Sequence, residues 1–126
     1  KHSEYTDQIN KEKFSPEPYP HLENFKLKEL TLGEYSATLC LSPLKVVEEG
    51  QAMHHCVGSY SETVGRGRYL VYSIRKNGKR TSTLGINVSA EGKYSENQHY
   101  AACNQTVKEA DELELASQLV KELNNI

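Results

Sequence analysis

Two strand-like runs around an Asn-Gly turn at 77–78 constrain the fold of this chain more than any other feature. The runs cover residues 69–75 and 81–88, and a slip of one residue between them would move every side chain of one strand to the other face. In the one register that gives a coherent apolar face, Ile74 pairs with Ser82, Tyr72 with Leu84 and Leu70 with Ile86. The pattern therefore predicts a hairpin with one loop residue more than the two-residue turn. It also predicts that Arg75 and Thr83 share the opposite, more polar face.

Two helices are predicted before this hairpin. Ser42 is a suitable N-cap and Pro43 suits the first helical position, while Gly50 is expected to end that helix. A second helix is expected over residues 51–64, because apolar residues recur there at helical spacing. These residues are Met53, Val57, Tyr60 and Val64.

Short strands are expected around residues 25–30 and 35–41, and a further strand at 93–100. Thr106 and Glu109 have the spacing of a capping box at the start of a last helix. Its predicted buried stripe is Ala110, Leu113, Ala116, Val120 and Leu123. Together these elements predict an α+β fold, a small and mainly antiparallel sheet with two or three helices packed on it.

The length of 126 residues is ordinary for a single domain. Residues 1–23 are polar and carry prolines at every second position from 16 to 20, so we expect a linker or extended arm there. Phe14, Tyr19 and Leu22 are the side chains that would dock this arm. Residues 24–126 are expected to form one α+β domain.

Composition excludes several classes of protein. No stretch approaches the roughly 20 apolar residues of a membrane span, so no membrane partner is expected. The three cysteines are widely spaced and odd in number, which favours reduced thiols in a cytoplasmic protein. The net charge of −2 requires any nucleic-acid footprint to be local. The densest basic stretch consists of Arg66, Arg68, Arg75, Lys76, Lys79 and Arg80.

The run His54-His55-Cys56 is the first candidate for chemistry. A Cys beside a His is typical of nucleophilic catalysis, but adjacent helical residues point about 100° apart and do not face each other. Cys56 is therefore either a nucleophile or a buried, inert thiol at the edge of the apolar stripe. His55 can act as an acid, a base or a phosphate donor, whereas His54 is expected at the surface.

A zinc site is the second candidate. Its ligands would come from His54, His55, Cys56, His99 and Cys103. These residues lack the closely spaced pairs of most zinc sites, so neither a metal nor another cofactor is expected.

A polar set of Arg75, Thr83, Gln98 and Asn104 is the third candidate. An Arg can bind a phosphate or carboxylate with two hydrogen bonds, and Gln and Asn amides can orient a substrate. The alternative is that Arg75 is a solvated charge at the end of the hairpin and that Asn104 caps a turn.

The order of these motifs resembles the PcfJ-like family, which occurs in bacterial conjugative plasmids, phages and other mobile elements. The pieces that carry the resemblance are Glu49-Gly50, Met53-His54-His55-Cys56-Val57-Gly58-Ser59-Tyr60, Ile74-Arg75, Thr83-Leu84, Gln98 and Asn104. The chain looks like the C-terminal His-Cys-Val-Gly-x-Tyr domain of longer proteins. It departs from the family pattern at Gly85, where an acidic residue is common, and at Ala101 and Ala102, where Gly is frequent. The resemblance implies a setting in mobile elements and does not specify a reaction.

Two hypotheses for function follow. In the first, the domain is catalytic on nucleic acid or a nucleotide, without a tightly held metal. His55 would be the acid or base, Arg75 would hold phosphate, Gln98 and Asn104 would position the substrate, and Thr83 would orient Arg75 or the substrate. In the second, the domain is a non-catalytic binding module of a DNA-transfer or defence complex. The same residues would then recognise a nucleic acid or a protein partner.

Overall fold

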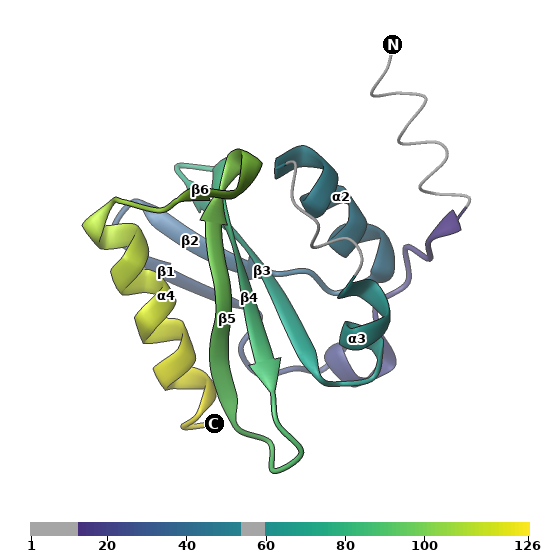
Figure 1. Ribbon diagram of the computed structural model, residues 1–126. Helices are drawn as coiled ribbons and strands as arrows, with labels where there is room; N and C mark the ends of the chain where they lie inside the picture. Colours follow the sequence, from purple (N-terminus) through teal and green to yellow (C-terminus); the bar gives the residue numbers. More distant parts are fainter. Residues whose placement is uncertain (1–12, 54–59) are drawn as a thin grey trace.

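The computed structural model describes residues 13–53 and 60–126, and within them six strands form one antiparallel sheet (Figure 1). The strands are β1 (Glu29–Leu32), β2 (Tyr35–Leu39), β3 (Tyr69–Lys76), β4 (Lys79–Val88), β5 (Tyr94–Ala101) and β6 (Gln105–Thr106). Their order in the sheet follows their order in the chain. With helices on the sheet, this architecture confirms the predicted α+β fold class. The expected strand at 93–100 corresponds to β5, and the strand expected around 25–30 begins later, at Glu29.

The hairpin of β3 and β4 has the predicted register. Ile74 pairs with Ser82, Tyr72 with Leu84 and Leu70 with Ile86. The turn itself differs from the prediction, because Lys76 pairs with Lys79 and only two residues lie between them. Asn77 and Gly78 have φ angles of 53° and 86°, as a two-residue turn that matches the twist of the strands requires. The additional residue is instead a bulge in the sheet, where the register shifts after Ile74.

Helices pack on both faces of this sheet. Helix α4 (Ala110–Leu123) contacts β1, β2 and β5, whereas α2 (Pro43–Met53) contacts β4 and α3 (Ser61–Gly65) contacts β3. Figure 1 shows α4 on one side of the sheet and α2 and α3 on the other. Successive side chains of a strand point to opposite faces. Ser82 accordingly reaches Glu112 of α4, and its neighbour Thr83 reaches Glu49 of α2.

The main hydrophobic core lies between the sheet and α4. The predicted apolar face of the hairpin supplies it, together with the inner face of the helix. Its fully buried members include Tyr72, Ile74, Leu84, Ile86, Leu115, Leu119 and Leu123. Burial of such side chains contributes about 1.5–3 kcal/mol each to stability, so this layer holds the hairpin in its register.

The prediction for the helices before the hairpin was wrong in its boundaries. Ser42 does cap α2, since its Oγ accepts a hydrogen bond of 3.2 Å from the backbone N of Lys45. The helix continues through Gly50, which is buried inside it, and ends at Met53. The expected helix over 51–64 is therefore not one element. Its first residues belong to α2 and its last ones to α3, and residues 54–59 lie outside the described part of the chain.

The start and the buried stripe of the last helix also differ from the prediction. Thr106 lies in β6, and Glu109 is the N-cap residue without a side-chain hydrogen bond, so there is no capping box. Leu113 is 44% exposed, and the buried residues of α4 are Glu112, Leu115, Ala116, Leu119 and Leu123. The apolar pattern did not predict this stripe because one of its positions holds a carboxylate, Glu112.

The segment before β1 is attached to the domain. Tyr19 and Leu22 are buried, the backbone N of Tyr19 donates to the carbonyl of Leu41 at 2.7 Å, and the backbone N of Leu44 donates to the carbonyl of Ser15 at 3.0 Å. These contacts hold residues 15–22 beside the start of α2. Within the two described ranges no helix has the length and apolar character needed to cross a bilayer.

Candidate functional site

A pocket of about 440 Å³ opens on the α2 side of the sheet. Its wall is formed by α2 and the end of β2 with the residues between them, by the second half of β3, by the start of β4, and by the segment before β1. The lining residues are Pro16, Pro18, Thr38, Leu39, Cys40, Leu41, Ser42, Lys45, Glu49, Ser73, Arg75 and Arg80. Arg75 is therefore the one member of the predicted polar set that lines this pocket.

Arg75 and Arg80 project into the pocket from directly paired positions of β3 and β4. Like charges at paired positions of an antiparallel sheet destabilise it. The two guanidinium groups differ in their partners. Arg80 forms a 2.8 Å ion pair through Nε with Oε1 of Glu49, whereas Arg75 donates through Nε to Oγ of Ser73 at 3.2 Å. Among the described residues, Arg75 has no carboxylate partner.

Glu49 is the buried charge at the base of the pocket, with an exposed fraction of 1%. Its Oε1 accepts from Arg80, and its Oε2 accepts a short hydrogen bond from the hydroxyl of Thr83. A buried carboxylate is tolerated only when its oxygens are paired in this way. Glu49 consequently holds the side chain of Arg80, and Thr83 holds Glu49.

The charged groups around the pocket favour an anion. Among the described residues that line it, Lys45, Arg75 and Arg80 carry positive charge, and Glu49 alone carries negative charge. Lys45 and Ser42 also bring the N-terminus of α2 to the pocket, where the helix dipole favours negative charge. The first N–H groups of this helix already have protein partners, because those of Lys45 and Val46 donate to Ser42 and that of Leu44 donates to the carbonyl of Ser15. Arginine forks match the planar oxygens of phosphate and carboxylate groups.

Cys40 contributes a thiol to the pocket but not a nucleophile. Burial, and secondarily the carboxylate of Glu49, raise the pKa of this thiol well above its ordinary value. The reactive form of cysteine is the thiolate, which these surroundings disfavour. Cys40 therefore acts as part of the apolar wall.

Gln98 lies on β5 and contacts Tyr69 rather than the pocket. Its Nε2 is 3.5 Å from the hydroxyl of Tyr69, and the neighbouring Asn97 donates through Nδ2 to the same hydroxyl at 2.8 Å. The ring of Tyr60, the last residue of the family octapeptide, stacks on Tyr69 with centroids 4.5 Å apart. Gly85 makes this arrangement sterically possible, because a side chain at this position would meet the Tyr69 ring.

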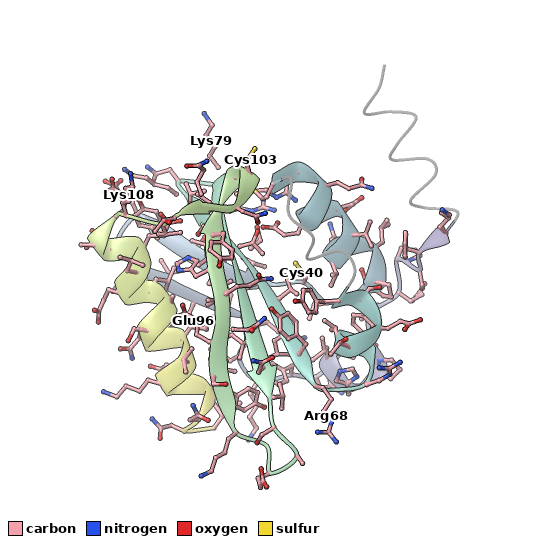
Figure 2. The ribbon with its side chains drawn as sticks, viewed as in Figure 1. Cys40, Arg68, Lys79, Glu96, Cys103 and Lys108 are labelled. Atoms are coloured by element: carbon pink, nitrogen blue, oxygen red, sulfur yellow. The ribbon has the colours of Figure 1, made fainter. Side chains whose placement is uncertain are left out.

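Asn104 ends the short helix η3 (Ala102–Asn104), which contacts α2. Cys103 and Asn104 have φ angles of 58° and 60°, so the backbone turns sharply between β5 and β6. Figure 2 shows Cys103 at this corner, and its thiol is exposed. Asn104 does not line the pocket of Arg75.

The predicted residues His55 and Cys56 lie outside the described residues, as does His54. In the part of the chain that the structure describes, no group of three His, Cys, Asp or Glu side chains could hold a metal ion. His99 is buried and Cys103 is exposed at the corner of η3. The roles expected for His55, Cys56, Gln98 and Asn104 therefore stay predictions.

A second polar cluster lies on the opposite face of the sheet, under α4. Glu112 accepts through Oε2 from Ser82, by a short hydrogen bond, and from Thr81 at 2.7 Å. Oγ of Ser82 lies 2.9 Å from Nε2 of His99. Because Ser82 donates to Glu112, Nε2 of His99 carries the proton, and Nδ1 is buried without a hydrogen-bond partner in the described structure. Burial lowers the pKa of His99 below its ordinary value of 6.5, and Glu112 opposes this effect.

Sequence reasoning assigned no role to Glu49, which entered only as part of the family resemblance, and none to Glu112 or Arg80. A signal for the two carboxylates was present. Glu49 falls between the buried Val46 and Met53 at helical spacing, and Glu112 falls three residues before Leu115. A carboxylate inside an apolar stripe indicates a buried charge that needs specific donors.

A comparison with family models confirms the resemblance to the PcfJ-like family. The sequence matches the family described as PcfJ-like protein over residues 1–124. No curated protein and no solved structure matches it significantly.

Proposed function

The chain belongs to the PcfJ-like family, and we propose that its pocket binds a phosphate group of a nucleic acid or a nucleotide. In this proposal the domain is a recognition module of a DNA-transfer or defence complex of a mobile element. Arg75 contacts the phosphate, and Arg80 and Lys45 add positive charge around it.

The pairing of Arg75 with Arg80 is the observation that carries the proposal. Two like charges occupy paired positions of neighbouring strands, and among the described residues only one of the two, Arg80, has a carboxylate partner, Glu49. An arrangement that costs stability without a ligand is typical of a functional site. A bound phosphate would supply the negative charge that Arg75 lacks.

Binding of fluorescently labelled single-stranded and double-stranded DNA and RNA tests this proposal. We expect one of these nucleic acids to bind with an affinity that falls as salt concentration rises, because phosphate contacts release counterions. The Arg75→Ala variant should lose most of this binding. The Arg68→Ala variant is the matched control, since Arg68 is an exposed arginine that does not line the pocket. Unchanged binding by Arg75→Ala, or no binding of any nucleic acid or nucleotide, would refute the proposal.

Catalysis on the bound nucleic acid or nucleotide is the second candidate function. The observation that favours it is a carboxylate, Glu49, in the same pocket as Arg75, so that an anionic group and a phosphate-binding cation line one cavity. His55 would be the acid or base, with Cys56 as the alternative nucleophile, and Gln98 and Asn104 would position the substrate. The roles of these four residues are predictions from the sequence.

Incubation of the protein with labelled DNA and RNA, with and without EDTA, separates the two candidates. Cleavage or modification that survives EDTA and is lost in His55→Ala supports catalysis. Retention of the nucleic acid without any reaction supports the binding module alone.

A further inference from the structure

We propose that the pocket recognises a terminal phosphate monoester, and not the phosphodiester of an internal linkage. The phosphorylated end of a strand and a nucleoside monophosphate both carry this group. The inference rests on the proposed function, because it specifies which kind of phosphate the Arg75 pocket takes. The orientation of the two guanidinium groups, the balance of charge and the shape of the pocket support it.

Both guanidinium groups use Nε within the protein and keep their terminal nitrogens for a ligand. Nε of Arg75 donates to Ser73, and Nε of Arg80 donates to Glu49. Within the described residues, the terminal nitrogens of neither arginine make a hydrogen bond to the protein. Each guanidinium can therefore contact two oxygens of one group. A monoester has three non-bridging oxygens for these donors, and a diester has two.

The charge balance of the pocket matches a dianion. Among the described residues that line the pocket, Glu49 compensates Arg80, which leaves the charges of Arg75 and Lys45 around the cavity. A phosphate monoester carries about −1.5 to −2 at pH 7 because its second pKa is about 6. A phosphodiester carries a single negative charge and would leave one of the two cations uncompensated. Because Lys45 is exposed, its pairing with the second charge of a monoester adds a modest preference and does not remove a buried charge.

The shape of the pocket favours the end of a chain. Its volume of about 440 Å³ is that of a small-molecule site, for which about 300–1,000 Å³ is usual. Five of its described lining residues are buried and close its inner side, namely Leu39, Cys40, Ser42, Glu49 and Ser73, and Pro16 and Pro18 form part of its wall. An internal phosphodiester would have to bring a nucleotide on each side into this space, whereas a terminal phosphate enters with one.

One oligonucleotide sequence tests the inference when it is prepared with a 5′-phosphate, with a 3′-phosphate, and with hydroxyl groups at both ends. We expect one phosphorylated end to bind the 126-residue chain about tenfold more tightly than the hydroxyl form, since charged hydrogen bonds are stronger than neutral ones. The preference should shrink between pH 7.5 and pH 5.5, as the monoester gains a proton near its second pKa of about 6. Competition by adenosine monophosphate, with adenosine as the control, shows whether a nucleotide suffices or a strand is required.

Variants connect the preference to the pocket. Arg75→Ala should abolish the preference for the phosphorylated end, and Arg75→Lys should reduce it, because lysine keeps the charge but loses the two-pronged contact. Arg68→Ala should leave it unchanged. Figure 2 shows Arg68 at the far end of β3, pointing away from the body of the protein. If Arg75→Ala does not fold, Arg75→Lys and the pH dependence of the unaltered chain still decide the question.

Two results would overturn the inference. Equal binding of all three oligonucleotides, with equal loss in Arg75→Ala, refutes selection of a monoester and leaves the proposed function intact. The absence of binding by every oligonucleotide and by adenosine monophosphate refutes both.

Discussion

The hydroxyl of Tyr69 occupies the space that a side chain at Gly85 would need. A Cβ atom added at Gly85 would overlap this oxygen and lie 2.7 Å from Cζ of the same ring. Asn97 and, more distantly, Gln98 contact this hydroxyl. The ring of Tyr69 stacks on the ring of Tyr60. The absence of a side chain at Gly85 thus determines how the end of the octapeptide packs on the sheet.

Gly85→Ala should destabilise the fold by about 1–3 kcal/mol, because the added methyl group forces the buried ring of Tyr69 to move. Chemical denaturation measures this change. Combining Gly85→Ala with Tyr69→Phe removes the closest atom, so the double variant should lose less stability than the sum of the single variants. Strict additivity of the two losses would show that the ring and the glycine are not coupled. The Gly92→Ala variant is not a suitable control, since Gly92 has a φ of 81° that requires glycine for a different reason.

Glu49→Ala should cost about 3 kcal/mol of stability, because it removes the partner of Arg80 and of the buried Thr83 hydroxyl. The matched control is Glu34→Ala. Glu34 lies 3.7 Å from Lys76 in an exposed ion pair, and such pairs contribute about 0–1 kcal/mol. Denaturation midpoints of both variants measure the difference. Equal effects of the two substitutions would contradict the role of Glu49 as a buried clamp on Arg80.

The register of the hairpin was predictable, and the clusters on its two faces were not. Only one register placed the apolar residues of both strands on the same face. The alternation of apolar and polar residues in the two strands was therefore sufficient to predict that Tyr72 pairs with Leu84 and Leu70 with Ile86. The bulge near the turn was not predictable, because a longer loop gives the same register.

The limits of helix α2 and the polar clusters depended on tertiary contacts. Gly50 is a frequent helix end, yet it lies inside α2 because packing on the sheet compensates for its low helix propensity. Glu49 and Glu112 could be recognised as carboxylates in apolar stripes. Their partners, Arg80, Thr83 and Ser82, lie 30 or more residues away in sequence and are brought close only by the fold.

Stability should fall with decreasing pH below about 6.5 because of His99. Its pKa in the folded protein is below the ordinary value of 6.5, so the unfolded chain binds more protons in the window between the two pKa values. The contribution of His99 is therefore complete above pH 6.5 and is lost as the pH falls toward the folded pKa. Free energies of unfolding at several pH values between 5 and 8 measure this slope.

A histidine variant assigns the slope. His99→Gln should reduce the pH dependence of stability in this window, because it removes the buried imidazole. An undiminished slope in His99→Gln would mean that other groups cause it.

Cys40 should resist alkylation in the folded protein, and Cys103 should react. The thiol of Cys40 is buried and its pKa is raised by burial, whereas the side chain of Cys103 is exposed. Treatment with iodoacetamide at pH 8, followed by mass spectrometry of the peptides, measures modification at each site. Denatured protein, in which both cysteines should react, is the control. Rapid modification of Cys40 under native conditions would contradict a closed inner wall of the pocket.

The most direct test of the central claim is the response of the arginine side chains to phosphate. The chain has four arginines, at positions 66, 68, 75 and 80, so their Nε–H resonances form a small and assignable set in a nitrogen-15 NMR spectrum. Titration with a 5′-phosphorylated dinucleotide should shift the resonances of Arg75 and Arg80 in a saturable way and leave those of Arg66 and Arg68 nearly unchanged. Shifts confined to Arg66 and Arg68, or no shift at any arginine, would show that the pocket at Arg75 does not bind phosphate.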